Sequence, residues 1–397
     1  HERLDDEQEE HDGHAGQDHR EDVGAAVDGE RLRLFGADVG GRAHDGVGLG
    51  EARGGAFEQF GDAEIGEEEV AVRVDQGVGS LFSDPDPDKA RAFFAGKRRD
   101  MVDKRTTVVE AVREFVHDGS YLAIGGFGAN RIPTAVLHEI VRQGKKNLSF
   151  AGHTSTHDFQ ILVAGNCIKR VDVAYIIGLE ARGLSPNARR VMESGEVEVC
   201  EWTNYAMCVR LRAAADGLSF GIARDLLGTD TFRYSAGQVI ACPFTGKKFA
   251  ALPALWPDVA VIHVHEADMY GNAVFKGISI ADMELARAAK HLIITAERLV
   301  SNFTIRSNPT ATSIPFYLVD AVVEVPYGSY PGNMPYLYFS DEEHLAAWMK
   351  AEKDPKEFEK FLDHYIYGVS CFEEYLERCG GLKKLKELQK QETLVEK

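Results

Sequence analysis

The chain has 397 residues, of which 63 are acidic and 45 basic, so its formal net charge is −18 at neutral pH. Residues 1–100 hold 26 of the acidic and 12 of the basic side chains, and the rest of the chain is close to neutral. We therefore expect neither nucleic acid nor a membrane as a partner. No run approaches the roughly 18 apolar residues that a membrane span needs.

Residues 1–100 contain no Asn, Thr, Tyr, Trp, Cys or Met and a single isoleucine. A segment with so little apolar surface to bury is expected to be disordered. The chain begins with His1, whereas Met101 directly precedes an amphipathic pattern. We interpret 1–100 as an acidic extension, either from a start assigned too far upstream or as a genuine tail. No apolar stretch follows a basic start, so no secretory signal is expected there.

Residues 101–380 are expected to form the folded domain, because apolar runs alternate there with helical patterns. Thr107 and Glu110 have the spacing of a capping box, followed by apolar residues on one helical face. Strands are expected at residues 122–124, 148–151, 171–177, 197–200, 259–264, 292–295 and 317–325. Helices are expected at residues 133–144, 187–194, 204–215, 283–290 and from about 341 onward, with 381–397 as a charged, solvated helical tail. This alternation predicts an α/β fold with a mainly parallel open sheet flanked by helices.

The stretch after the first expected strand is the most informative. Residues 118–133 read Asp-Gly-Ser-Tyr-Leu-Ala-Ile-Gly-Gly-Phe-Gly-Ala-Asn-Arg-Ile-Pro. Paired glycines at a strand end let the backbone approach a ligand and leave N–H groups free to point at it, although they also suit a plain turn. The whole pattern resembles the signature of the family I coenzyme A transferases, in their A subunit. Arg131, where many members carry glycine, is more similar to the glutaconate CoA-transferase branch.

A small polar stretch at residues 151–157 follows the second expected strand. Ligands usually lie at the carboxyl ends of strands in open α/β sheets. In the family that this chain resembles, the equivalent loop helps to line the site for acyl-CoA and acid. Here it carries His153, Thr154, Ser155 and Thr156, where the glutaconate branch is rich in glycine and alanine. A helix N-cap by Ser155 or Thr156 is the alternative interpretation.

The resemblance continues through residues 258–273, 282–298 and 319–331, and so covers nearly all of 101–397. It implies the NagB/RpiA/CoA-transferase-like fold. His263 and His265 also allow a metal site, although alternate residues on a strand point the same way and can simply pack. The chain has no Walker A or G-x-G-x-x-G motif, which argues against nucleotidase and dehydrogenase functions.

The resemblance implies transfer of CoA between an acyl-CoA and a small carboxylic acid. In the family, an enzyme glutamate attacks the thioester and becomes a glutamyl-CoA thioester, with ping-pong kinetics. That glutamate lies in a Ser-Glu-Asn-Gly-like motif of the B subunit or C-terminal half, which is absent here. Glu193-Ser194-Gly195 is the nearest approach, and Gly195 is expected to follow a helix end. The chain is therefore expected to be the A subunit of a hetero-oligomer with a CoA-transferase B subunit, without a catalytic residue of its own.

The resemblance also implies where the substrate lies. Gly125, Gly126 and Phe127 are expected to form the wall near the thioester, and residues 153–156 the pocket loop. Arg131 is expected to pair with a distal carboxylate, or to be a surface arginine before a helix. The CoA thioester is a substrate, and neither a permanently bound cofactor nor a metal is expected. Six cysteines without C-x-x-C pairing predict reduced thiols in a cytoplasmic protein.

Three alternatives remain open. A CoA-thioester ring-opening hydrolase of the same fold carries an acid in its equivalent chain near position 204, where this chain has Asn204, with Glu201 close by. A non-catalytic ligand-binding module is the second, since related folds sense sugar phosphates. A stand-alone metal hydrolase using His263 and His265 is the third. The acid is left open among glutaconate, a 3-oxoacid and an aromatic-pathway dicarboxylate.

Overall fold

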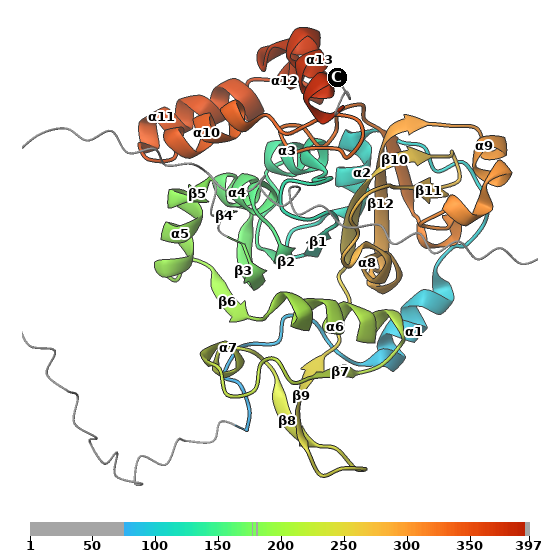
Figure 1. Cartoon of the computed structure of the whole chain (residues 1–397), viewed down its shortest axis with the longest axis vertical. Coiled ribbons are helices and arrows are strands. Elements are labelled where there is room, and N and C mark those ends of the chain that lie inside the picture. The colour runs from blue at the N-terminus through green and yellow to red at the C-terminus, as the bar shows by residue number, and fades with distance from the viewer. Residues whose placement is uncertain (1–74, 177, 180–181, 394–397) are drawn as a thin grey trace, which may run out of the picture. The chain divides into compact units, whose positions relative to one another are not determined.

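An open sheet of eight strands lies at the centre of the part of the chain that the structure describes, residues 75–176, 178–179 and 182–393 (Figure 1). In this computed structural model the strands lie, in order across the sheet, as β13 (Ala321–Glu324), β12 (His291–Leu299), β10 (Val259–Ala267), β1 (Tyr121–Ile124), β2 (Leu148–Thr154), β3 (Ile168–Tyr175) and β6 (Glu198–Glu201). The eighth strand, β11 (Ala273–Val274), pairs antiparallel with β10, and all other neighbours are parallel. The expected α/β fold with a mainly parallel open sheet is therefore confirmed.

Helices cover both faces of this sheet (Figure 1). One face carries α2 (Val108–Phe115), α3 (Thr134–Arg142), α4 (His157–Ala164), α5 (Pro186–Glu193), α10 (Glu342–Ala351), α11 (Pro355–Leu362), α12 (Phe372–Arg378) and α13 (Gly381–Glu392), with a π-helical turn at Asp363–Tyr367. The other face carries α1 (Pro87–Gly96), α6 (Asn204–Ala215) and α8 (Asp282–Ala288).

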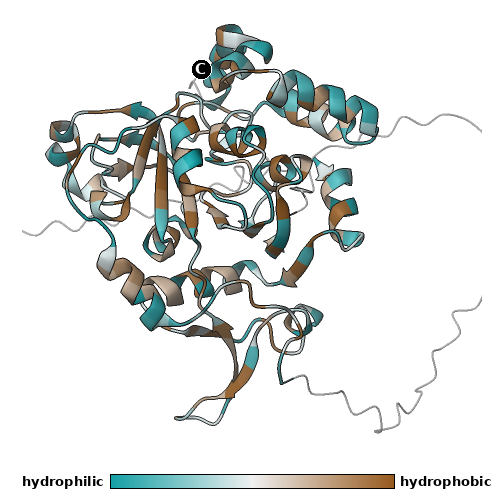
Figure 2. Cartoon of the chain, turned by 180° about the vertical axis from the view of Figure 1, so that it is seen from behind, coloured by the Kyte–Doolittle hydropathy of each residue, from teal (hydrophilic) through white to brown (hydrophobic). Residues whose placement is uncertain are grey.

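Two hydrophobic cores result, because successive strand residues point to opposite faces. In β1, Leu122 belongs to one core, and Tyr121 and Ala123 belong to the other. Figure 2 shows hydrophobic segments in the central strands and in the helices that border them. The strands therefore read as continuous apolar runs, as expected for a parallel sheet that is covered on both faces.

The order of the strands reverses between β1 and β10. From β1 the chain moves through β2 and β3 to the edge strand β6, and it then returns to β10, beside β1, before building β12 and β13 on the other side. In open α/β sheets the crevice at such a reversal, outside the carboxyl ends of the strands, is the usual ligand-binding place. The topology therefore directs attention to the segment that follows β1.

A buried ion pair fixes α6 to the sheet. The guanidinium of Arg210, on α6, lies 3.0 Å from Oδ1 of Asp172 on β3, and neither side chain is exposed by more than 1%. The indole N–H of Trp202 donates to the same carboxylate oxygen, and the guanidinium lies over the indole ring. These contacts set the position of α6, whose first residue is Asn204.

Two small antiparallel sheets lie outside the main one. One contains β7 (Phe220–Ala223), β9 (Lys248–Pro253) and β8 (Gln238–Ala241), and the other pairs β4 (Gly178–Leu179) with β5 (Gly183–Leu184). The remaining short helices are α7 (Asp230–Arg233), α9 (Asn302–Ser307) and the 3-10 turns Pro309–Ala311 and Phe316–Leu318. None of the helices that the structure describes has the length and apolar character needed to cross a bilayer.

Two expectations about the ends of the domain need correction. Residues 75–100 are not disordered: Asp86 caps α1, which begins at Pro87, and Lys97 forms an ion pair of 2.8 Å with Asp320. The composition of the whole segment 1–100 hid this short ordered part, and residues 1–74 lie outside the described residues. At the other end, α13 is helical as expected, but it buries Leu385 and Leu388 instead of lying free in solvent.

Candidate functional site

Two glycines end β1 at the point where the strand order reverses. The N–H of Gly125 continues the ladder by donating to the carbonyl of Val261 at 2.9 Å. A Cβ atom on Gly125 would lie 2.8 Å from Oδ1 of Asp282, which is too close for a real side chain. Gly126 has a φ of +84°, in the left-handed region that favours glycine. Gly125 is therefore needed because the start of α8 packs directly against it, and Gly126 because of its backbone conformation and the carbonyl of Asn130, which would lie 2.3 Å from a Cβ atom.

The residues after the glycines fold into a tight loop. The backbones of Phe127 and Asn130 exchange two hydrogen bonds of 2.9 Å, and the N–H of Gly128 donates to the carbonyl of Thr154 at 2.7 Å. The N–H groups of all four residues 125–128 thus have protein acceptors. The expectation that this loop offers free N–H donors to a ligand is therefore wrong. The loop can form a wall for a ligand, but those donors are occupied.

Arg131 is fully buried and is bound at two points by Asp282. Nη2 lies 2.8 Å from Oδ2 of the carboxylate, and Nη1 lies 3.1 Å from Oδ1. The guanidinium also donates to the carbonyl of Ile278 at 2.8 Å and lies over the ring of Phe275. Since these contacts occupy it, the interpretation of Arg131 as a partner for a substrate carboxylate is wrong. It acts instead as a positioning residue, because Oδ1 of Asp282 also accepts the N–H of Gly126 at 2.9 Å.

Asp282 opens α8 and remains ionised although it is buried. Burial would raise the pKa of its carboxyl, but the Arg131 guanidinium and the hydrogen bonds from Gly126 and Ser279 outweigh burial and lower the pKa. The carboxylate is therefore a fixed negative charge that holds the glycine loop and Arg131 together. Arg131 itself has a φ of +58°, an uncommon conformation for a residue other than glycine.

The second predicted segment lies directly beside the glycine loop. Strand β2 continues to Thr154. His153 and Thr154 are therefore strand residues, whereas they were expected to belong to a loop. The carbonyl of Thr154 accepts the N–H of Gly128, and the hydroxyl of Thr156 donates to the carbonyl of Gly128 at 2.9 Å. The structure thus brings together the two segments that the sequence singled out, at the carboxyl ends of β1 and β2.

The first turn of the helix that follows contains an aspartate that binds the residue before the helix. Thr156 occupies the N-cap position of α4, but its side chain makes no capping hydrogen bond there. Its N–H instead donates to Oδ1 of Asp158 at 2.7 Å. The N-cap interpretation is therefore wrong for the Thr156 side chain. Asp158 is 5% exposed, and its burial raises the pKa of the carboxyl to about 6, against hydrogen bonds from Ser155 and the backbone that lower it.

Asn204, at the start of α6, contacts the end of β2 beside the glycine loop. Its side-chain N–H donates to the hydroxyl of Thr154 at 3.2 Å, and that hydroxyl also lies 3.0 Å from Nδ1 of His153. Burial lowers the pKa of His153, despite its contacts with the backbone of Asn204 and the charge of Asp282, so the ring is neutral at neutral pH. His153, Thr154 and Asn204 form a neutral polar group beside the loop.

Burial divides the eight predicted site residues into two groups. Gly126, Phe127 and His153 are partly exposed and so present surface to a ligand. The other five are buried and support the first group: Gly125, Arg131, Thr154, Ser155 and Thr156.

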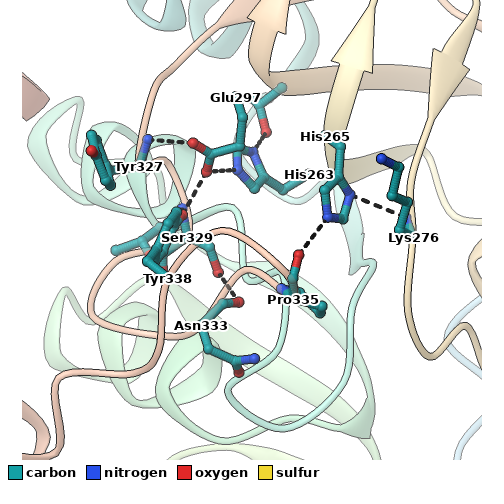
Figure 3. Close-up of polar contacts among 11 residues, drawn as sticks. His263, His265, Lys276, Glu297, Tyr327, Ser329, Asn333, Pro335 and Tyr338 are labelled. Atoms are coloured by element: carbon teal, nitrogen blue, oxygen red, sulfur yellow. Dashed lines mark hydrogen bonds and ion pairs between the residues drawn. The ribbon is translucent and has the colours of Figure 1, made fainter. Parts of the chain in front are cut away.

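His263 and His265 lie at the end of β10 and face protein groups on both sides of each ring (Figure 3). In His263, Nδ1 is 2.8 Å from the Thr295 hydroxyl and Nε2 is 2.8 Å from Oε1 of Glu297. In His265, Nε2 lies 2.8 Å from the carbonyl of Pro335, and Nδ1 accepts the N–H of Lys276 at 3.1 Å. With all four nitrogens engaged, these rings pack as structural groups, and the metal-site interpretation loses its support.

The network around Glu297 fixes a further loop, residues 327–335 (Figure 3). The Tyr338 hydroxyl donates to Oε1 of Glu297 at 2.5 Å, and the N–H of Tyr327 donates to Oε2 at 2.7 Å. Within this loop the carbonyl of Asn333 accepts the N–H of Arg131 at 2.9 Å. The glycine loop is thus held from one side by Asp282 and from the other by Asn333.

Asp282, Glu297 and Asn333 are the supporting residues that the sequence did not reveal. Asp282 is far from Arg131 in sequence, and neither residue shows a local pattern that pairs it with the other. The only signal was the position of Asp282 directly before the helix expected at residues 283–290.

The two acids of this chain that could replace a partner's nucleophile lie elsewhere. Glu193 forms a surface ion pair of 2.7 Å with Arg189 on α5. The helix ends there and Gly195 follows with a φ of +76°, as expected for a residue after a helix end. Glu201 ends β6, at the edge of the sheet, and burial raises the pKa of its carboxyl.

Comparison with known proteins identifies one family. The family model described as coenzyme A transferase matches residues 105–325. An uncharacterized protein of Archaeoglobus fulgidus is 48% identical over 326 residues, which are 82% of this chain and 73% of that protein. This stretch is longer than the part of the chain after Met101, so it includes residues upstream of Met101.

The similar proteins with named activities include two CoA-transferases. The A subunit of the 3-oxoadipate CoA-transferase of Pseudomonas knackmussii is 34% identical, over 68% of this chain and 95% of its own length. The crystal structure of glutaconate coenzyme A-transferase from Acidaminococcus fermentans superimposes with a TM-score of 0.70 at 29% identity, over 72% of this chain and 95% of that chain.

Proposed function

Because this chain belongs to the coenzyme A transferase family, we propose that it is the A subunit of an enzyme that moves coenzyme A from an acyl-CoA to a small carboxylic acid. One observation carries the proposal. The wall formed by Gly126, Phe127 and His153 lies at the strand-order reversal, yet Asp282, which binds Gly126, and Asp158, which binds Thr156, are both buried and hydrogen-bonded. The site is built to receive a thioester and needs a nucleophile from elsewhere.

The reaction then runs by covalent catalysis in two halves. A glutamate from the partner chain attacks the acyl carbonyl, and the thiolate of CoA leaves, which gives a mixed anhydride. The thiolate attacks the glutamyl carbonyl of the anhydride and releases the first acid, so that a glutamyl-CoA thioester remains. The second acid reverses these steps and leaves as its CoA thioester. In this scheme the present chain supplies binding surface and orientation.

Each part of the site has a distinct task in this proposal. The ring of Phe127 and the backbone of Gly126 form the wall beside the thioester, and the buried Arg131–Asp282 pair keeps this wall in place. The neutral ring of His153 presents a polar group without adding charge beside the acyl carbon. A cationic partner for a second substrate carboxylate is not assigned, because Arg131 is already occupied.

Asn204 favours transfer over the ring-opening hydrolase. A hydrolase needs a base that activates water, and an amide does not accept a proton at neutral pH. Asn204 instead donates a hydrogen bond to Thr154, beside His153. The assignment to the cytoplasm also remains a proposal, supported by six cysteines that are all free thiols.

The test is exchange of CoA between labelled acetate and a panel of acyl-CoA esters, including glutaconyl-CoA and 3-oxoadipyl-CoA. It is run with this chain alone and with this chain mixed with a B-type partner chain. We expect exchange only in the mixture. Exchange by the chain alone would refute the assignment of the nucleophile to a partner. Loss of thioester to water in the mixture, without exchange, would favour the hydrolase.

A further inference from the structure

A cavity of about 310 Å³ lies at the carboxyl-terminal ends of α6 and α8, which are remote from the glycine loop. Helix α1 closes its other side. Three arginines and three aromatic rings dominate its lining: Arg91, Arg99, Arg287, Phe94, Trp256 and Tyr317. No aspartate or glutamate is among the residues that line it.

The three guanidinium groups keep most of their donors free for a ligand. Arg91 pairs at 3.0 Å with Asp88, but both side chains are more than 70% exposed, so the pair is weak. Arg99 makes one hydrogen bond of 3.3 Å to a backbone carbonyl. Arg287 donates to the carbonyl of Met283 at 3.3 Å and lies 3.9 Å from Glu284. Each guanidinium has five N–H donors, and these contacts use only a few of them.

Lys97 also lines the cavity, but it is not available to a ligand. Its ammonium group is bound to Asp320 at 2.8 Å and donates to the carbonyls of Lys290 and Leu318 at 2.9 Å. It anchors α1 to the sheet and so holds Arg91 and Arg99 at the rim. The positive charge that a ligand meets comes from the arginines.

We propose that this cavity binds a phosphorylated planar ligand with the chemistry of an adenine nucleotide. Guanidinium groups match phosphate oxygens in a two-point geometry, and aromatic side chains provide flat walls against which a base can stack. The volume lies in the range of small-molecule sites. The proposal uses none of the residues that were assigned to the transferase site.

Two ligands have this chemistry. One is a free nucleotide. The other is the phosphorylated adenosine end of CoA, and this second possibility rests on the proposed function. Helix α8 connects the two places, because Asp282 at its start holds Gly126 and Arg287 near its end borders the cavity. A helix of seven residues is about 10 Å long, a distance that the flexible arm of CoA can bridge.

Calorimetric titration of the full chain with ADP tests the site without any need for transferase activity. We expect one ADP to bind per chain, and inorganic phosphate and adenosine to bind at least tenfold more weakly. The double variant Arg91→Glu with Arg287→Glu should weaken ADP binding at least tenfold. The matched control is Arg189→Glu, which changes an exposed helical arginine that also pairs with an acid on its own helix.

The outcomes separate clearly. Undetectable ADP binding at millimolar concentration, or equal binding by the double variant and the wild type at equal thermal midpoints, would overturn the proposal. In the assembled enzyme, a raised KM for acyl-CoA in the double variant with unchanged kcat would identify the ligand as the adenosine end of CoA. ADP binding that leaves this KM unchanged would identify a free nucleotide. If CoA exchange is absent altogether, the binding result on the chain alone still decides the proposal.

Discussion

Arg131 and Asp282 show how single residues shape the site without touching the substrate. Both side chains are at most 1% exposed, so each charge has lost its water and depends on the other. In such a pair the cost of removing water from the charges is already incurred, and loss of one partner leaves the other uncompensated. The chain uses this pair to hold Gly126, which lies in a conformation that few residues adopt.

Replacement of Arg131 by methionine should therefore lower the free energy of unfolding by about 3–5 kcal/mol. The double variant Arg131→Met with Asp282→Asn should recover part of that loss, because the uncompensated charge is removed. Arg105→Met is the matched control, since Arg105 also forms a two-point pair, with Asp103, but at the surface. Denaturant titration measures all three. Equal losses for Arg131→Met and Arg105→Met would show that burial of the pair does not matter.

Asp158 gives a prediction with a defined pH range. Its pKa is raised from 3.8 in the unfolded chain to about 6, mainly by burial, so its contribution to stability is complete below about pH 4 and is lost as the pH rises through 6. Asp158→Asn keeps an acceptor for the N–H of Thr156 but does not ionise. Relative to the wild type, this variant should gain stability, by up to about 3 kcal/mol, between pH 4 and pH 7.5. Denaturant titration at both pH values measures the difference, and one that does not change with pH would contradict the raised pKa.

At the level of elements, the sequence predicted the parts that carry a periodic pattern. Residues 204–215 were expected to be helical and are α6, and the capping box of Thr107 and Glu110 is present at the start of α2. The short strands β7 to β9 were missed, because the partly exposed residues in them obscure a strand pattern. Helix α1 was missed because the acidic composition around it outweighed its own capping signal, Asp86 before Pro87.

The glycine loop and residues 153–156 were predicted as a site because each follows an expected strand and resembles a segment of the coenzyme A transferase family, and both are properties of the local sequence. The residues that hold these two segments in place lie in distant parts of the chain, so the local sequence could not predict them. Arg131, for example, looked free because its carboxylate partner is 151 positions away.

The role of α1 can be tested at Lys97. Its side chain is 5% exposed and binds Asp320, which is 15% exposed. Lys97→Met should lower the free energy of unfolding by roughly 2–4 kcal/mol, because Asp320 then loses its ammonium partner in a buried place. Lys89→Met, which breaks the exposed pair of Lys89 on α1 with Asp84 before the helix, should have no comparable effect. Thermal and denaturant unfolding of the two variants provide the comparison. Similar stability would mean that α1 does not depend on this contact.

For the whole molecule, the core between the sheet and the C-terminal helices contains three buried histidines. These are His138 on α3, His157 on α4 and His344 on α10. Burial lowers the pKa of all three, to about 3 for His157 and about 4 for His344, so the folded protein keeps them neutral. The unfolded chain binds protons at these residues near pH 6.5, which makes folding less favourable as the medium becomes acidic.

The free energy of unfolding should therefore fall as the pH drops from about 6.5 toward 4. The expected contribution of His344 alone is about 3 kcal/mol. His344→Gln should flatten this part of the profile, and replacement of the exposed His117 by Gln should leave it as it is. Denaturant titrations between pH 4 and pH 8 give the profiles. A wild-type stability that is constant between pH 6.5 and pH 4.5 would contradict the neutral state of the buried rings.

The central claim is that this chain binds the thioester while a partner chain supplies the nucleophile. The most direct measurement is to incubate the chain and its B-type partner with acyl-CoA, trap the covalent intermediate with hydroxylamine, and locate the modified residue by mass spectrometry. A glutamyl hydroxamate on the partner, with this chain unmodified, is the predicted result. A hydroxamate on an acid of this chain, such as Glu193 or Glu201, would contradict the account.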